Sequence, residues 1–125
     1  MGCRSDIGLC LSTKGKEALD AALAKAEKSN KDFSRIKRLM DNPDAFKIAY
    51  DGTVGYLWEY VKWYADYIEV SFIEDLLDGM EEREYLFLRV GESDGDSEYR
   101  GNFWDNPLGM LPIRGIDFDP WTGPQ

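Results

Sequence analysis

The chain has 125 residues, of which 43% are hydrophobic and 14% aromatic, and it carries a formal net charge of −9 with no histidine. This length and composition predict one compact domain over residues 1–125 that needs no disulfide or metal to fold. The missing histidine removes the commonest general base and the commonest transition-metal ligand, and no apolar run is long enough to span a membrane.

The acidic charge is concentrated after residue 42. Residues 1–42 contain nine Lys and Arg against six Asp and Glu, whereas residues 43–125 contain six against eighteen. A field of this sign repels a phosphate backbone and attracts basic proteins. Free nucleic acid is therefore not an expected partner, and neither is a membrane.

In chain order, the first expected elements are one strand and two helices. Alternating apolar residues predict a strand over residues 4–13. Apolar positions spaced by three and four residues predict helices over residues 14–30 and 32–42. Ser12 or Thr13 is expected to cap the first of these helices, because a side-chain oxygen there can accept a backbone N–H of the first turn.

The clearest local feature is a predicted β-hairpin at residues 45–64. Asp51-Gly52 is a dipeptide preferred in tight hairpin turns. After it, six aromatic rings fall between Val54 and Tyr67. Simple alternation along the second strand predicts one face formed by Tyr56, Trp58 and Tyr60 and an opposite face formed by Leu57, Glu59, Val61 and Trp63.

The remaining sequence predicts a third helix followed by strands. Ser71 and Glu74 have the spacing of a capping box, and Gly79 marks the end of the helix. A strand is expected over residues 84–92, with shorter ones over 97–104 and 111–118. The order β-α-α-β-β-α-β-β-β predicts an α+β fold, with a mainly antiparallel sheet of about five or six strands and two or three helices packed on one face.

The aromatic run has two main interpretations. Since the helices cover one face, the other face of residues 54–64 is expected to meet water or a partner. One interpretation is ordinary core packing beneath a tyrosine-rich sheet surface, and the other is a recognition surface, because Tyr and Trp dominate binding hot spots. Stacking of nucleic-acid bases would require basic surroundings, and the neighbouring charges are mainly acidic.

The segment GESDGDSEYRG at residues 91–101 carries alternating carboxylates. It could form a solvated turn between strands, an acidic docking element or a calcium loop. The calcium-binding EF-hand requires glycine at its sixth position, where this segment has Tyr99, so that motif does not match. No catalytic carboxylate pair, nucleophile motif or phosphate-binding loop is marked in the sequence. We therefore assign no catalytic residue, no metal site and no cofactor.

The residues from Leu57 to Phe103 resemble small proteins encoded by tailed bacteriophages and prophages. The matching residues are Trp58, Val61, Lys62, Trp63, Tyr64, Phe87, Arg89, Gly91 and Glu92. The resemblance implies an accessory protein acting in the cytoplasm of an infected bacterium, a setting that includes anti-CRISPR inhibitors of host defence. From the residues alone, Arg89 is expected to pair with an acid on the next strand and Gly91 to permit the turn.

These observations predict a cytoplasmic protein that engages a basic surface of a host protein, in its sharpest form an inhibitor of a nucleic-acid-handling defence complex. The alternatives are a small carboxylate-based enzyme and a structural or morphogenetic phage subunit. A homodimer through a sheet face or edge stays open. The predicted partner-binding residues are Tyr56, Trp58, Glu59, Tyr60, Trp63, Tyr64, Asp66, Glu92, Asp94, Asp96 and Glu98.

Overall fold

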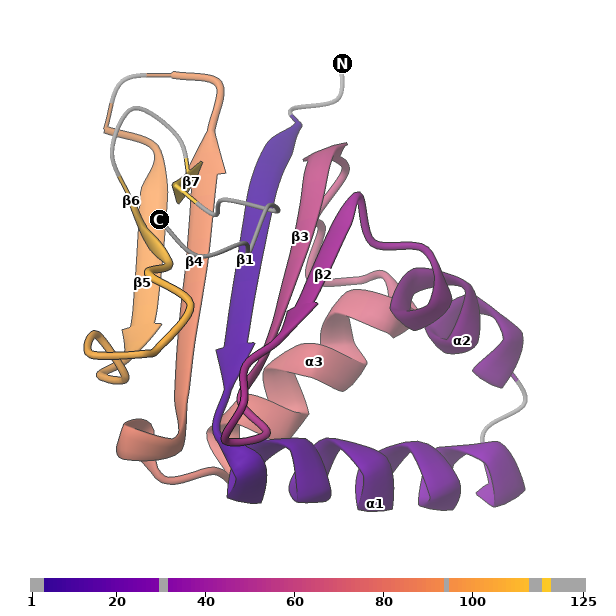
Figure 1. Ribbon diagram of the computed structural model, residues 1–125. Helices are drawn as coiled ribbons and strands as arrows, with labels where there is room; N and C mark the ends of the chain where they lie inside the picture. Colours follow the sequence, from indigo (N-terminus) through magenta and orange to yellow (C-terminus); the bar gives the residue numbers. More distant parts are fainter. Residues whose placement is uncertain (1–3, 30–31, 94, 113–115, 118–125) are drawn as a thin grey trace.

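The structure, a computed structural model, describes residues 4–29, 32–93, 95–112 and 116–117. Its elements in chain order are β1 (Ser5–Leu11), α1 (Thr13–Ser29), α2 (Phe33–Asp41), β2 (Ala45–Ile48), β3 (Val54–Val61), α3 (Ile68–Asp78), the 3₁₀ turn η1 (Glu82–Glu84), β4 (Tyr85–Gly91), β5 (Ser97–Gly101), β6 (Leu111–Pro112) and β7 (Ile116–Asp117). Within these residues, three α-helices lie on one side of a five-stranded sheet, which confirms the α+β class (Figure 1).

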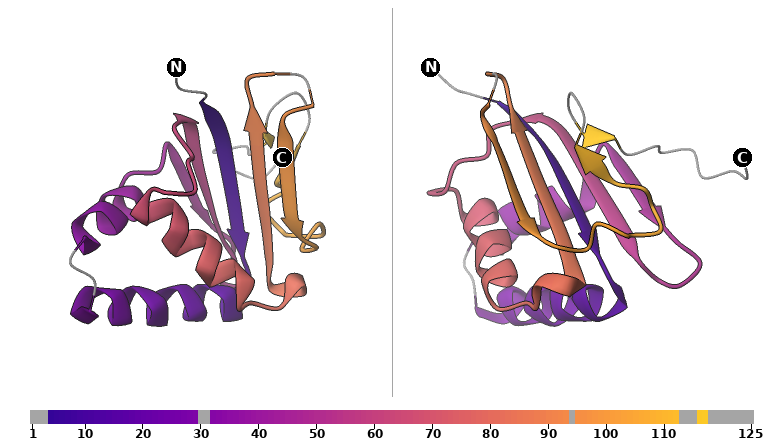
Figure 2. Two further views of the ribbon diagram at one scale, coloured as in Figure 1. Left: turned by 180° about the vertical axis from the view of Figure 1, so that it is seen from behind. Right: turned by 90° about the vertical axis from the view of Figure 1, so that its left-hand side faces the viewer.

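The sheet is antiparallel and follows the order β2-β3-β1-β4-β5. The first strand therefore lies at the centre, paired with β3 on one side and β4 on the other, and β2 and β5 form the two edges (Figures 1 and 2). The strand predicted over residues 111–118 is instead two short strands, β6 and β7, which pair with each other in a separate sheet.

One hydrophobic core lies between the sheet and the helices. Its fully buried side chains come from every helix and from the central strands: Ile7, Leu9, Leu11, Leu19, Ile36, Ile73, Leu77 and Phe87. The helical members recur at the spacing that the sequence showed, because one stripe of each helix faces the sheet. This core is the largest source of the hydrophobic free energy that stabilises the fold.

The opposite face of the sheet is also covered, so the expectation that it meets water or a partner is wrong. Leu108 and Met110, from the segment that follows β5, pack against Cys10, Leu57 and Leu86, and all five side chains are buried. This covering segment is mostly irregular before β6. Because irregular backbone has no periodic apolar pattern, its role as a core layer could not be recognised from the sequence.

Strand β3 contains a bulge that simple alternation did not predict. Ile7 pairs with Trp58, whereas Ser5 pairs with Val61, so two residues of β3 stand opposite one residue of β1. Tyr60, in the bulge, has a φ of 56°, the left-handed conformation that residues other than glycine rarely adopt. Such an extra residue reverses the direction of every following side chain.

Two carboxylates satisfy the backbone of this bulge. Asp44 accepts the N–H of Glu59 at 2.6 Å, and Asp6 accepts the N–H of Tyr60 at 2.9 Å. Beyond the bulge, Val61 and Trp63 belong to the helix-side core together with Trp58, so the predicted division of faces is wrong after Trp58.

The helix starts agree with the sequence for α1 but not for α3. Ser12 Oγ accepts the N–H of Gly15 at 3.1 Å, which confirms it as the cap of α1. Helix α3 begins before Ser71, whose N–H donates to the carbonyl of Tyr67, so Ser71 lies inside the helix. The predicted capping box is therefore wrong, because the Glu74 carboxylate accepts a hydrogen bond from Arg100 of β5 instead of from the start of the helix.

The β2–β3 hairpin forms where it was predicted, with a slightly longer turn than the dipeptide suggests. The Ala49 N–H donates to the Thr53 carbonyl at 2.8 Å, which leaves three residues at the tip. Gly52 has a φ of +93° and closes the turn by donating to the Ala49 carbonyl at 3.0 Å. This is the three-residue hairpin in which glycine takes the left-handed position.

Candidate functional site

Two of the predicted aromatic anchors are core residues. Tyr56 and Trp58 are 6% and 2% exposed, and their rings stack with centroids 5.4 Å apart. The Trp58 indole N–H donates to the Leu39 carbonyl at 2.9 Å, so its one polar group is satisfied inside the fold. Burial removes both side chains from the predicted partner-binding surface, because neither can reach another molecule while the protein is folded.

The other predicted aromatic residues are more accessible. Tyr60 is 64% exposed because the bulge turns it away from the core, and the Arg4 guanidinium lies 4.9 Å from its ring centroid. Trp63 and Tyr64 are half-buried. The Trp63 ring packs against Phe87, with centroids 5.9 Å apart, and therefore contributes mainly to the core.

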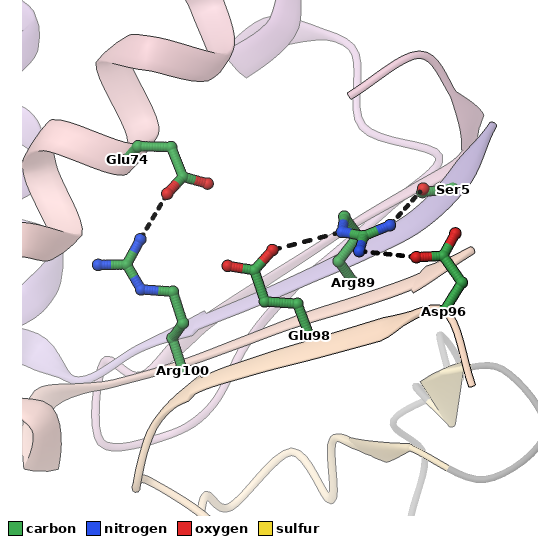
Figure 3. Close-up of polar contacts among 6 residues, drawn as sticks. All are labelled: Ser5, Glu74, Arg89, Asp96, Glu98 and Arg100. Atoms are coloured by element: carbon green, nitrogen blue, oxygen red, sulfur yellow. Dashed lines mark hydrogen bonds and ion pairs between the residues drawn. The ribbon is translucent and has the colours of Figure 1, made fainter. Parts of the chain in front are cut away.

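Two of the predicted docking acids turn inward to one arginine (Figure 3). Arg89, on β4, bonds Asp96 at 2.9 Å, Glu98 at 3.4 Å and Ser5 at 3.2 Å. These contacts confirm the expected pairing of Arg89 with an acid of the next strand, since Glu98 lies on β5. Because both carboxylates are half-buried and bound to a guanidinium, they contribute little charge toward a partner.

A second arginine, Arg100 on β5, lies on the same face of the sheet as Arg89 and joins the sheet to α3. Arg100 bonds Glu74 at 2.6 Å and Asp78 at 2.6 Å, and Figure 3 shows Glu74 reaching down from the helix to it. Burial raises the pKa of the Glu74 carboxyl, and the nearby Arg100 opposes this shift. The Trp63 indole N–H also acts to lower that pKa, yet it makes no hydrogen bond of normal geometry. We refer to Arg89, Arg100 and their partners as the β4–β5 ion network.

The remaining predicted acids are scattered over the surface. Glu59, Asp66 and Glu92 are exposed, and Glu92 accepts the backbone N–H of Arg4 at 2.9 Å. Asp94 lies outside the described residues. The structure therefore does not gather the predicted residues into one site.

A different pair of aromatic side chains is exposed at the β5 edge. Tyr99 and Trp104 are 49% and 47% exposed, and their rings meet edge to face with centroids 6.2 Å apart. Tyr99 lies opposite Leu88, so it projects from the face of β5 away from the helices. Sequence reasoning missed this pair because the contact between the two rings depends on the turn after β5, and the single aromatic of the strand, Tyr99, gave no sign of it.

Two exposed carboxylates belong to the same end of β5. Asp105 follows Trp104 directly in the chain, and the backbone carbonyl of Glu82 accepts the N–H of Asn102 at 2.8 Å. Both acids are exposed, and within the part of the chain that the structure describes neither forms an ion pair. We call Tyr99, Trp104, Glu82 and Asp105 the β5-edge surface.

The described residues offer little for covalent or metal chemistry. They contain no cluster of His, Cys, Asp and Glu suited to a metal ion. Cys10 is a free, buried thiol whose pKa burial raises to about 12, so it is not nucleophilic near neutral pH. Three surface hollows of about 390, 440 and 270 Å³ each contain a single carboxylate, Asp75 in the first and Glu69 in the other two.

None of the helices in the described ranges has the length and apolar character that a membrane span requires. Comparison with protein families, curated proteins and solved structures found no match to this chain.

Proposed function

We propose that this chain is a protein-binding protein that engages a basic surface of another protein through the β5-edge surface. The observation that carries the proposal is the exposed edge-to-face pair of Tyr99 and Trp104. Exposed acids occur at the same end of β5, at Asp105 next to Trp104 and at Glu82, whose backbone bonds Asn102. Aromatic side chains that are accessible in the free protein can be desolvated in a complex and so supply binding free energy. Uncompensated acids around them speed association with a basic partner and fix its orientation.

The partner class follows from charge and from the resemblance to phage accessory proteins. A net charge of −9 favours encounters with basic surfaces, which nucleic-acid-handling proteins commonly present. Carboxylates docked on such a surface can occupy positions that phosphates would take. The proposed activity is therefore inhibition of a host nucleic-acid-handling protein by competition for its basic surface.

The carboxylate-enzyme alternative has less support. Glu74 has the raised pKa that an acid catalyst needs, but its carboxylate is bound to Arg100. None of the three hollows brings two carboxylates together, which carboxylate-based hydrolysis requires. We therefore favour binding over catalysis.

The experiment that tests the proposal has two stages. Immobilised protein is incubated with bacterial lysate, with and without nuclease, and the captured proteins are identified and purified. Binding of each purified candidate is then measured for the wild type and for Trp104→Ala and Glu82→Lys. We expect Trp104→Ala to weaken binding by about 30-fold, as loss of a hot-spot aromatic does. Glu82→Lys should slow association and reduce its dependence on salt.

Matched variants separate the function from the surface assigned to it. Glu27→Lys makes the same charge change at an exposed site on α1, and Tyr60→Ala removes the exposed aromatic of the bulge. Both should bind like the wild type. If Tyr60→Ala abolishes binding while Trp104→Ala does not, the β5-edge surface is wrong. If no protein is captured once nuclease has removed nucleic acid from the lysate, the proposed function itself is wrong.

A further inference from the structure

Among the described residues, the second edge of the sheet, strand β2, leaves backbone hydrogen-bonding groups unpaired. The Ala49 N–H donates to Thr53, so Ala49 and the alternate residues Lys47 and Ala45 direct their backbone groups toward β3. It follows that Phe46 and Ile48 direct their N–H and C=O groups away from the sheet. The strand order places β2 at this outer edge, and the views of Figures 1 and 2 agree.

The side chains along this edge are apolar and accessible. Phe46 and Ile48 are 45% and 62% exposed, and Tyr50 at the hairpin tip is 97% exposed. The side chains of Phe46 and Ile48 share one face, since they stand opposite Tyr56 and Val54 of the helix-side core. No proline or outward-pointing charge interrupts residues 46–48, because Lys47 is buried on the opposite face. Natural proteins protect a sheet edge with proline, outward charges, short strands or inward-pointing charges. Strand β2 lacks the first two and has only its four-residue length and the buried Lys47, which limit pairing without preventing it.

We propose that β2 pairs with β2 of a second copy of this chain, in an antiparallel dimer that makes the two sheets continuous. Charge permits a second copy at this position. Residues 32–51 contain four basic and four acidic residues, so this segment is neutral while the whole chain carries −9, and two copies can approach there. The basic partner of the proposed function is attracted to acidic surfaces instead, and the β5-edge surface lies at the opposite edge of the sheet.

A register centred on Ile48 fits the side chains on both faces. It places Ile48 opposite Ile48 of the partner subunit and Phe46 opposite Tyr50 of the partner subunit, so the exposed apolar groups cover one another. It also sets Lys47 opposite Ala49 of the partner subunit, which keeps the two lysines from meeting directly. A strand of four residues buries a small area, below the roughly 1,200 Å² that stable complexes bury. The dimer is therefore expected to be weak and concentration-dependent.

Sedimentation equilibrium of the full chain between about 5 and 500 µM tests the proposal, because mass action then reveals a weak dimer. Ile48→Lys should raise the dimer dissociation constant at least tenfold. Ile48→Pro should do the same while the monomer stays folded by circular dichroism, because it removes only an outward-facing N–H. Tyr99→Lys, at the opposite edge, should dimerise like the wild type.

The outcomes separate this inference from the proposed function. A wild type that stays monomeric throughout the range overturns the dimer, as does a dimer that Tyr99→Lys disrupts and Ile48→Lys does not. Ile48→Lys should still bind the purified partner with wild-type affinity per monomer. A loss of partner binding in that variant would show that β2 contacts the partner and would overturn the assignment to a second copy.

Discussion

Gly91 packs closely against Asp96, which contacts it through both its backbone carbonyl and its side-chain carboxylate. Its N–H donates to the Asp96 carbonyl at 2.6 Å, and an added Cβ would overlap Asp96 Oδ2 and lie 2.9 Å from the Asp96 carbonyl oxygen. The requirement for glycine therefore comes from close approach and not from a left-handed backbone. Because Asp96 also bonds Arg89, any side chain at position 91 would disturb the β4–β5 ion network.

Replacing Gly91 with alanine should lower the free energy of unfolding by about 1–3 kcal/mol, because the Asp96 carboxylate must leave Arg89. Urea denaturation measures the change. Gly79→Ala is the matched control, since its φ is −96° and the nearest atom to an added Cβ is the Leu76 carbonyl oxygen at 3.9 Å. That variant should be as stable as the wild type or slightly more stable. Equal losses in both variants would contradict the role assigned to Asp96.

At the scale of elements, the starts of α1 and α3 are built in different ways. Ser12 accepts the Gly15 N–H at the start of α1, and its hydroxyl also donates to the Glu84 carboxylate, which ties the helix to η1. The N-cap of α3 is Tyr67, which makes no side-chain hydrogen bond to the helix. Tertiary contacts therefore set the first residue of α3, whereas a local side chain sets that of α1.

Ser12→Ala should destabilise the protein by about 1 kcal/mol, and by somewhat more if the bond to Glu84 contributes, because the Gly15 N–H loses its acceptor. Ser71→Ala tests the cap that the sequence suggested, and it should change stability by less than about 0.5 kcal/mol because Ser71 lies within the helix. Thermal and urea unfolding of both variants provide the comparison. A larger loss for Ser71→Ala would mean that α3 begins at the predicted cap.

At the scale of the whole molecule, the sheet is a shared layer between two cores. The core opposite the helices depends on a turn held by Asn106, which is 6% exposed. Its amide donates to the carbonyls of Phe103 and Met110 and accepts the N–H of Met110 at 2.9 Å. These bonds hold Met110 in contact with the sheet, so the covering segment is part of the folded domain.

Met110→Ala should lower the free energy of unfolding by about 2–4 kcal/mol, because it leaves a cavity beneath the covering segment. The neighbouring Leu111, which is 39% exposed, serves as control, and Leu111→Ala should cost less than about 1 kcal/mol. Unfolding followed by both tryptophan fluorescence and far-ultraviolet circular dichroism should show one shared transition. Separate transitions would indicate that the covering segment is not coupled to the helix-side core.

Only the types of residue in the candidate site, and not their positions, could be predicted from the sequence. Exposed aromatic rings among acids were expected from composition, but their positions were not, because exposure depends on which face of each strand is covered. The bulge at Tyr60 moved Trp63 into the core, and the irregular segment from Phe103 to Met110 covered the face that had been expected to remain open. Asp96 and Glu98 are likewise bound by Arg89, a contact between β4 and the residues that follow the next turn, so they are less available to a partner.

Local pattern was enough to predict the α+β class, the order of the elements up to β5, the hairpin and a cap at Ser12 or Thr13, because each depends on residues within a few positions of one another. Which strands form the edges, where β3 bulges, what covers the second face and which charges are neutralised became evident only in the folded chain. Those features arise from contacts between residues far apart in the chain. A local pattern of apolar or charged residues does not predict such contacts.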